Sequence, residues 1–180
     1  MIGTNDIKGI YNSAWGAGTV EKFQLAEELS YSNFRKNVKK IIDRCASERS
    51  VVKVGVSTLP MMGEDLNSRA NACVKKANTI IREIVEGVRD DRVEVIDVHE
   101  KLEKYLLRNS SQGEREASLK VEKFYGVAAE ILFKNKLLGM SYDKISEKYG
   151  LKVMVDSLHL NDRGATIVKN EICNWLRSSE

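Results

Sequence analysis

The chain has 180 residues, 42% of them hydrophobic and 31% charged, and a formal net charge of +3. This composition is typical of a globular protein, excludes a disordered or fibrous chain, and at this length predicts a single domain over residues 1–180. Basic residues are scattered among acidic ones and no run of about 20 apolar residues occurs, so we expect neither a nucleic-acid partner nor a membrane span.

The sequence opens with the apolar pair Met1-Ile2, followed directly by Gly3-Thr4-Asn5-Asp6. In an α/β protein this pattern is typical of a strand that ends in a functional loop. Only two residues of strand precede the loop, so the chain is expected to begin in the middle of an element. Residues 8–30 carry glycines and aromatic residues without a clear period, which predicts a surface loop.

Helical and strand patterns alternate after residue 30. Apolar residues three or four apart over 31–47 predict an amphipathic helix, with Ser30 or Ser32 as its cap. The next expected elements are a buried strand over 51–60, a helix over 64–87, a strand over 93–98 and a helix that begins near Leu102. This order predicts right-handed βαβ units and a parallel sheet, whose ligands bind beyond the carboxyl ends of the strands.

The C-terminal part is expected to be mostly helical. A polar linker over 109–113 precedes predicted helices over 117–135, 141–151 and 162–177, the last one capped by Asn161 or Asp162. The short helix at 141–151 is superficially similar to the first helix of a helix-turn-helix motif. No recognition helix follows it, so DNA binding is not expected.

An Asp and a His lie three residues apart just before the final helix. Asp156 follows the apolar run 153–155, and His159 is one of only two histidines in the chain. A carboxylate so placed can accept a hydrogen bond from one ring nitrogen, fix the tautomer and leave the other nitrogen as a general base. The same pair can also be a purely structural hydrogen bond. The other histidine, His99, directly follows a predicted strand and is interpreted as structural.

The two polar clusters, Gly3-Thr4-Asn5-Asp6 and Asp156-Ser157-Leu158-His159-Leu160-Asn161, together resemble the SGNH (GDSL-type) hydrolase family. The order of the intervening strands and helices and the ending Leu160-Asn161-Asp162-Arg163-Gly164-Ala165 are similar as well. The resemblance implies an α/β fold with a flavodoxin-like three-layer parallel sheet. It also implies an ester hydrolase acting on a small acyl or acetyl ester, without metal or organic cofactor. Asn5 would donate to the oxyanion, His159 would be the general base, and Asp156 would orient it.

The sequence departs from the family in two places. The span between the clusters is long, which implies a helical insertion over 109–149. The family's serine nucleophile in a Gly-Asp-Ser motif is absent, and so is the block that supplies an oxyanion-hole glycine. Ser57, at a strand end, is the best substitute by location but is better explained as a turn hydroxyl, and Ser157 as loop structure. Without such a serine the acyl-enzyme step cannot occur, so the chain as given is expected to be inactive.

Three explanations of the missing blocks stay open: an incomplete chain of an active esterase, a natural truncated form that acts as a non-catalytic binding module, or a partner that supplies the missing strands and nucleophile. Missing first strands would leave a sheet edge exposed, which favours self-association. The odd cysteine count, Cys45, Cys73 and Cys173, favours a reduced protein over one disulfide plus a free thiol. A reduced protein is in turn expected in the cytoplasm. The lack of a signal peptide says nothing about location if the N-terminus is truncated, as expected here.

Overall fold

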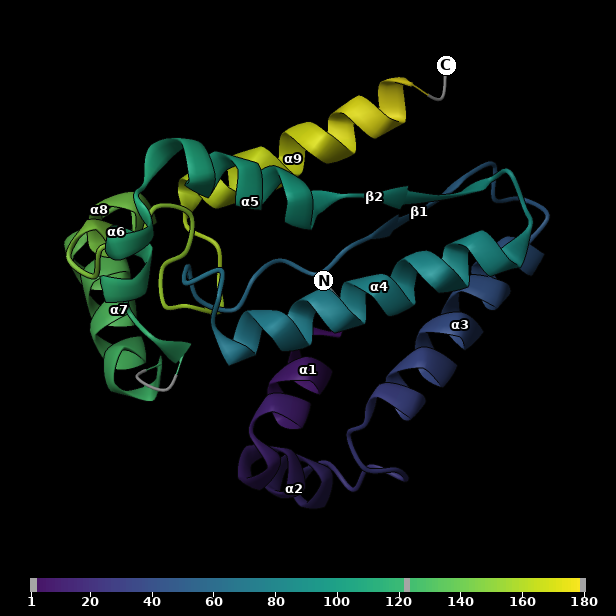
Figure 1. The fold of residues 1–180 in the computed structure, drawn as a ribbon, viewed down its shortest axis with the longest axis horizontal. Coiled ribbons are helices and arrows are strands. Elements are labelled where there is room, and N and C mark those ends of the chain that lie inside the picture. Colours follow the sequence, from purple (N-terminus) through teal and green to yellow (C-terminus); the bar gives the residue numbers. More distant parts are fainter. Residues whose placement is uncertain (1–2, 122–123, 179–180) are drawn as a thin grey trace. The chain divides into compact units, whose positions relative to one another are not determined.

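The computed structural model describes residues 3–121 and 124–178, so the expected strand at Met1-Ile2 lies outside the described residues. The chain divides into two compact units (Figure 1). The first comprises Met1–Leu59 and Cys73–Asp97, and the second Pro60–Ala72 and Val98–Glu180. The expected single domain with an insertion at 109–149 stays a prediction.

The first unit contains the sheet. Strands β1 (Val54–Ser57) and β2 (Val93–Ile96) pair in parallel, with Val54 opposite Val93 and Ser57 opposite Ile96. The predicted parallel pairing is therefore confirmed, although both strands are shorter than expected. Helix α3 (Tyr31–Ser47) has the predicted bounds, and the Ser30 hydroxyl caps it by accepting a hydrogen bond from Asn33 N.

Helix α4 (Arg69–Val88) starts five residues later than predicted. Residues 64–68, which were predicted to be helical, are not in a helix. Asn71, in the first turn of α4, accepts a hydrogen bond from Met62 N and donates to the carbonyl oxygens of Gly63 and Asp65. These bonds replace the helical ones that an earlier start would need, so the apolar periodicity alone placed the start wrongly.

The predicted loop over residues 8–30 is wrong. Most of it forms helices α1 (Thr4–Tyr11) and α2 (Ser13–Lys22), and the Asn12 side chain caps α2 by accepting from Trp15 N. Two glycines of this segment, Gly9 and Gly16, allow the helices to approach closely, because a Cβ on Gly16 would lie 2.6 Å from the carbonyl oxygen of Gly9. Asn5 therefore lies in the first turn of a helix, and the expected loop at Gly3-Thr4-Asn5-Asp6 is wrong beyond its first residue.

The second unit is helical. Its helices are α5 (Val98–Asn109), α6 (Gln112–Ala117), α7 (Phe124–Leu138), α8 (Tyr142–Glu147) and α9 (Asp162–Arg177). The predicted helix over 117–135 is wrong in its start: α6 ends at Ala117, and 118–120 are not α-helical. Helix α9 has the predicted bounds. It lies beside α5 (Figure 1), whose Leu102 and Leu106 are fully buried.

A small apolar cluster connects the helices of this unit to the segment before Asp156. Ile131 of α7, Ile145 of α8 and Val155 are buried against one another.

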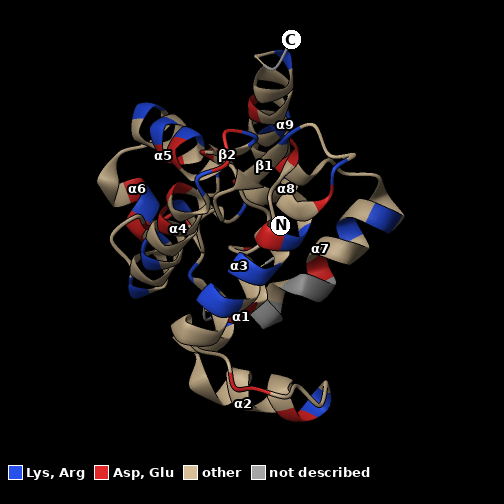
Figure 2. Ribbon diagram, turned by 90° about the vertical axis from the view of Figure 1, so that its right-hand side faces the viewer, with Lys and Arg blue, Asp and Glu red and all other residues tan. Residues whose placement is uncertain are grey.

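Figure 2 shows Lys and Arg mixed with Asp and Glu along the helices. Among the described helices, none is both long enough and apolar enough to cross a bilayer.

Candidate active site

Residues 153–161 form a tight antiparallel turn, named here the relay hairpin. Val155 N donates to the His159 carbonyl at 2.8 Å, and Asn161 N donates to the Val153 carbonyl at 3.0 Å. Met154 faces Leu160 across this short ladder. The turn at its tip needs Ser157 in a left-handed conformation with a φ of 74°. The hairpin brings Asp156 and His159, the two residues predicted to act together, to the two sides of its tip.

The carboxylate of Asp156 is the centre of the site. Its Oδ1 accepts hydrogen bonds from Leu158 N at 3.0 Å and His159 N at 2.7 Å, and its Oδ2 contacts His159 Nδ1 at 2.7 Å. The Asp156 side chain is 7% exposed and the His159 side chain 69% exposed. A buried carboxylate at Nδ1 favours the tautomer that carries its proton there, so Nε2 carries the lone pair that can accept a proton.

A buried glutamate holds the first strand of the relay hairpin. Glu64 is 1% exposed, and its carboxylate accepts hydrogen bonds from the backbone N–H groups of Lys152, Val153 and Met154. Burial raises the pKa of Glu64 above its usual value, whereas the N–H bonds from Val153, Lys152 and Met154 act in the opposite direction. The sequence analysis did not single out Glu64, because its partners lie far away in the chain.

The tip of the hairpin is held from two further sides. Gly63 N donates to the Ser157 carbonyl at 2.7 Å, and the Ser157 hydroxyl donates to the Leu119 carbonyl at 2.8 Å. Ser157 is fully buried. A hydroxyl that is buried and directed at a carbonyl agrees with the interpretation of Ser157 as loop structure rather than as a nucleophile.

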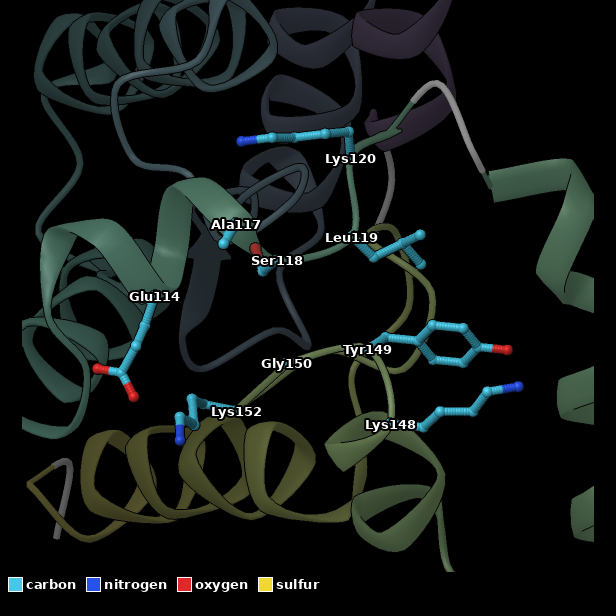
Figure 3. Close-up of a pocket in the computed structure, with 9 residues that line it drawn as sticks. All are labelled: Glu114, Ala117, Ser118, Leu119, Lys120, Lys148, Tyr149, Gly150 and Lys152. Carbon is cyan, nitrogen blue, oxygen red and sulfur yellow. The ribbon is translucent and has the colours of Figure 1, made fainter.

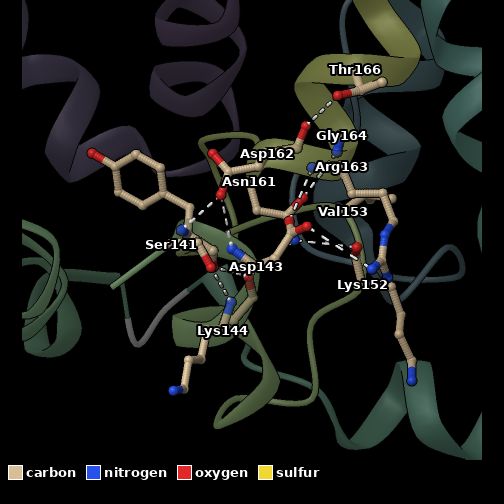
Figure 4. A network of polar contacts seen from close by, with 12 residues as sticks. Ser141, Asp143, Lys144, Lys152, Val153, Asn161, Asp162, Arg163, Gly164 and Thr166 are labelled. Atoms are coloured by element: carbon tan, nitrogen blue, oxygen red, sulfur yellow. Dashed lines mark hydrogen bonds and ion pairs between the residues drawn. The ribbon is translucent and has the colours of Figure 1, made fainter. Parts of the chain in front are cut away.

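The end of the hairpin merges with the start of α9 (Figure 4). The Asn161 side chain accepts from Gly164 N at 2.9 Å and donates to Ser146 Oγ at 3.0 Å, confirming Asn161 as the cap. A Cβ on Gly164 would lie 2.1 Å from the Val153 carbonyl oxygen, so only glycine allows this approach. Next to this cap, Asp162 accepts from Tyr142 N, and Asp143 accepts from Arg163 N, so α8 and α9 cap each other.

The other cluster that resembles the family lies in the first unit. Gly3, at the N-cap of α1, has a φ of +110°, and a Cβ there would lie 2.8 Å from a ring atom of Phe34. Asn5 is exposed in the first turn of α1. Its side chain makes no hydrogen bond to any residue within 3–121 or 124–178. The structure thus explains the glycine of this cluster but assigns no partner to Asn5.

The two residues interpreted as structural have surroundings that fit this interpretation. The Ser57 hydroxyl donates to the Thr58 carbonyl at 2.9 Å, as expected of a turn hydroxyl at the end of β1. His99 is 5% exposed in the first turn of α5. Neither residue is presented to solvent in the way that His159 is.

The comparison with known families assigns the chain to a family. The model of the GDSL-like lipase/acylhydrolase family matches residues 1–172. The chain belongs to the GDSL-like lipase/acylhydrolase family. Searches of the curated proteins and of the solved structures give no significant match. Membership of this family establishes an SGNH-type hydrolase with an α/β fold and makes an ester the expected type of substrate.

The second unit of this GDSL-like chain contains a pocket of about 470 Å³ (Figure 3). It is lined by Glu114, Ala117, Ser118, Leu119, Lys120, Lys148, Tyr149, Gly150 and Lys152. Leu119 connects it to the hairpin through the bond from Ser157, but none of the lining residues is Asp156 or His159. The side chains of Lys148 and Tyr149 both bond to Glu130, which is not part of the lining. Within the described residues, no group of three or more His, Cys, Asp or Glu side chains could hold a metal ion.

Proposed function

We propose that this chain provides the general base of an SGNH-type carboxylic ester hydrolase, with His159 as the base and Asp156 as its orienting acid. The observation that carries the proposal is the 2.7 Å contact between Asp156 Oδ2 and His159 Nδ1. The carboxylate is buried while the imidazole is exposed. This combination fixes the ring and leaves it accessible to a substrate, as a base of the Ser-His-Asp type requires.

The chemistry follows from these positions. A serine oxygen forms a bond to the ester carbonyl carbon while His159 Nε2 takes the hydroxyl proton. Asp156 stabilises the imidazolium, and the side-chain amide of Asn5 donates to the tetrahedral oxyanion. The bond to the alcohol oxygen then breaks, and His159 returns the proton to the leaving alcohol. Water repeats the sequence on the acyl-enzyme and releases the carboxylic acid.

The nucleophile of this scheme has no counterpart in the sequence. Gly-Asp-Ser does not occur in it. The hydroxyls of Ser57 and Ser157, weighed above as substitutes, both donate to carbonyl groups. We therefore propose that the chain as given performs no serine-dependent turnover, and that a flavodoxin-like three-layer sheet with the nucleophile requires strands beyond β1 and β2.

The test is hydrolysis of p-nitrophenyl acetate by the purified chain. We expect no burst of p-nitrophenol and no labelling of a serine by a fluorophosphonate, beyond the slow general hydrolysis that any exposed imidazole causes. The matched comparison is His159→Ala. A burst that is abolished by His159→Ala, together with a labelled serine, would contradict the proposed inactivity and identify the nucleophile.

A non-catalytic binding module is the second candidate, and the missing Gly-Asp-Ser motif favours it. The reading frame of the transcript distinguishes the two. A frame that continues upstream of Met1 into a Gly-Asp-Ser motif supports the hydrolase, and a stop codon directly upstream supports the binding module.

We also propose self-association through the free edge of β1. Among the described residues β1 pairs with β2 alone, and Gly55 in β1 is exposed. Unpaired strand edges favour pairing with another chain. Sedimentation velocity should show a species larger than the monomer of 20.3 kDa that is lost when Gly55 is replaced by proline. A strictly monomeric chain would contradict this.

A further inference from the structure

Glu64 is a buried ionisable residue without a role in the chemistry proposed above. It lies in the segment Pro60–Ala72 of the second unit, outside any helix or strand. Only 1% of it is exposed. A carboxylate is costly to bury unless hydrogen bonds replace its water shell, so its partners indicate why it is there.

Those partners are three consecutive backbone N–H groups. Glu64 Oε1 accepts from Lys152 N at 2.9 Å, Val153 N at 2.7 Å and Met154 N at 3.0 Å, and Oε2 accepts from Lys152 N at 2.9 Å. Bonds from N–H groups to a carboxylate are stronger than bonds between neutral groups. The three N–H groups belong to the residues directly before Val155 and Asp156, where the relay hairpin begins.

The ladder of the relay hairpin is too short to fix its register alone, and the contacts of Ser157 with Gly63 and Leu119 hold its tip rather than its first strand. Its own ladder consists of one residue pair, Met154 and Leu160, with two backbone bonds beside it. A slip of one residue would turn the Asp156 side chain to the opposite face, because side chains alternate along an extended strand. The hydrogen bonds to Glu64 oppose that slip, because in a shifted register different N–H groups would face the carboxylate.

We propose that Glu64 is a positioning residue: its carboxylate sets the register of the relay hairpin and so holds Asp156 against His159 Nδ1. This inference rests on the proposed function, because the pair it positions is the proposed relay. Glu64 touches no reacting atom in this account. It acts only through the backbone of Lys152, Val153 and Met154.

The experiment reads the tautomer of His159 from the ¹⁵N chemical shifts of its imidazole, at a pH where the ring is neutral. The unchanged chain should show the Nδ1–H tautomer. Glu64→Gln keeps the size of the side chain but turns an N–H donor towards Lys152 N. We expect this variant to show a mixture of tautomers, and Glu64→Ala to show the same or a larger change.

The control is Leu106→Ala, which truncates a fully buried side chain of α5 in the same unit and leaves Glu64 and residues 152–154 unchanged in sequence. It should destabilise the chain and leave the His159 tautomer unchanged. A folded Glu64→Gln variant with the tautomer of the unchanged chain would overturn the inference. So would a Leu106→Ala variant that loses the tautomer to the same extent, because Glu64 would then contribute stability alone.

A measurement on the unchanged chain decides the matter if both Glu64 variants fail to fold. Amide exchange of Val153 and Met154 is followed in subdenaturing urea together with the His159 tautomer. The Nδ1–H tautomer of His159 should be lost in the same local unfolding that exposes the amides of Val153 and Met154 to exchange. If the tautomer persists when these amides exchange freely, the inference is overturned. Failure of the proposed function looks different, because the unchanged chain would then lack the Nδ1–H tautomer from the start.

Discussion

The relay hairpin and the start of α1 carry the two family-like clusters, and they are built differently. In the hairpin, the buried Asp156 carboxylate accepts two backbone hydrogen bonds and contacts the exposed imidazole of His159. At the start of α1, Asn5 is exposed and its side chain bonds to none of the described residues. A Cβ would clash at a glycine beside or within each cluster: at Gly164 in α9, three residues after the end of the hairpin, and at Gly3 in the other cluster.

The difference shows which part of the site the fold itself determines. Asp156 and His159, the proposed orienting acid and base, are fixed by contacts inside one unit, so their geometry does not depend on a substrate. Asn5 lies exposed in the first turn of a helix, and in its proposed role as an oxyanion donor it would have its partner only when a substrate is bound. Variants of the two clusters should therefore differ strongly in stability.

The largest effect is expected from Gly164→Ala. The new Cβ would lie 2.1 Å from the Val153 carbonyl oxygen, so either α9 or the relay hairpin must move. We expect a loss of about 3 kcal/mol in the free energy of unfolding, as for an overpacked core. Urea denaturation measures it. The control is Gly113→Ala in α6, where a Cβ meets nothing within 4 Å. Equal stabilities of the two variants would contradict the close approach at Gly164.

A pair of asparagines tests the comparison next. Asn161 is 2% exposed, and its side chain bonds to Gly164 N, Ser146 Oγ and the Lys152 carbonyl. Asn161→Ala leaves these buried groups unpaired and should cost about 2 kcal/mol. Asn5→Ala, at an exposed position, should stay within about 0.5 kcal/mol of the unchanged chain. A large loss for Asn5→Ala in urea denaturation would mean that Asn5 is structural rather than an oxyanion donor.

The smallest effect is expected from Glu130, outside both clusters. Hydrogen bonds from Lys134, Lys148 and Tyr149 hold the pKa of Glu130 at about 2, below the ordinary value of 4.5. A lowered pKa stabilises the folded chain above pH 4.5, and this contribution is lost as the pH falls towards 2. Denaturation between these pH values should show a smaller acid-induced loss for Glu130→Gln than for the unchanged chain. The difference is small because the site is exposed to solvent.

The control for Glu130 is Glu147→Gln on the exposed side of α8, where no ion pair to a described residue exists. It should leave the acid-induced loss unchanged. An identical acid profile for Glu130→Gln and the unchanged chain would show that the cluster of Lys134, Lys148 and Tyr149 does not stabilise the carboxylate.

The helices and strands that are marked by nearby residues, through apolar periodicity, capping residues or β-branched runs, could be predicted from the sequence. The bounds of α3 and α9 follow from apolar periodicity together with the caps Ser30 and Asn161, and β-branched runs predicted β1 and β2. Helices α1 and α2 were missed because Gly9 and Gly16 pack helix against helix, a contact between segments that periodicity does not reveal. The Gly9 and Gly16 pair was the only available signal for this packing.

In the candidate site, too, contacts between residues close in the sequence could be predicted and contacts between distant residues could not. The spacing of Asp156 and His159 was enough to predict that they can meet, because the two residues between them suffice to form a turn. Nothing near Glu64 in the sequence predicts that its carboxylate binds N–H groups at 152–154. Apolar periodicity placed residue 64 at the start of α4 instead. A local pattern cannot reveal a contact between residues about 90 positions apart in the chain, such as Glu64 and Val153.

The most direct test of the central claim is the tautomer of His159 in the unchanged chain, compared with Asp156→Ala. With Asp156 in place, the imidazole ¹⁵N shifts should show the proton on Nδ1 and the lone pair on Nε2, and Asp156→Ala should abolish this preference. An Nε2–H tautomer in the unchanged chain, or a preference that survives Asp156→Ala, would contradict the assignment of His159 as a base oriented by Asp156.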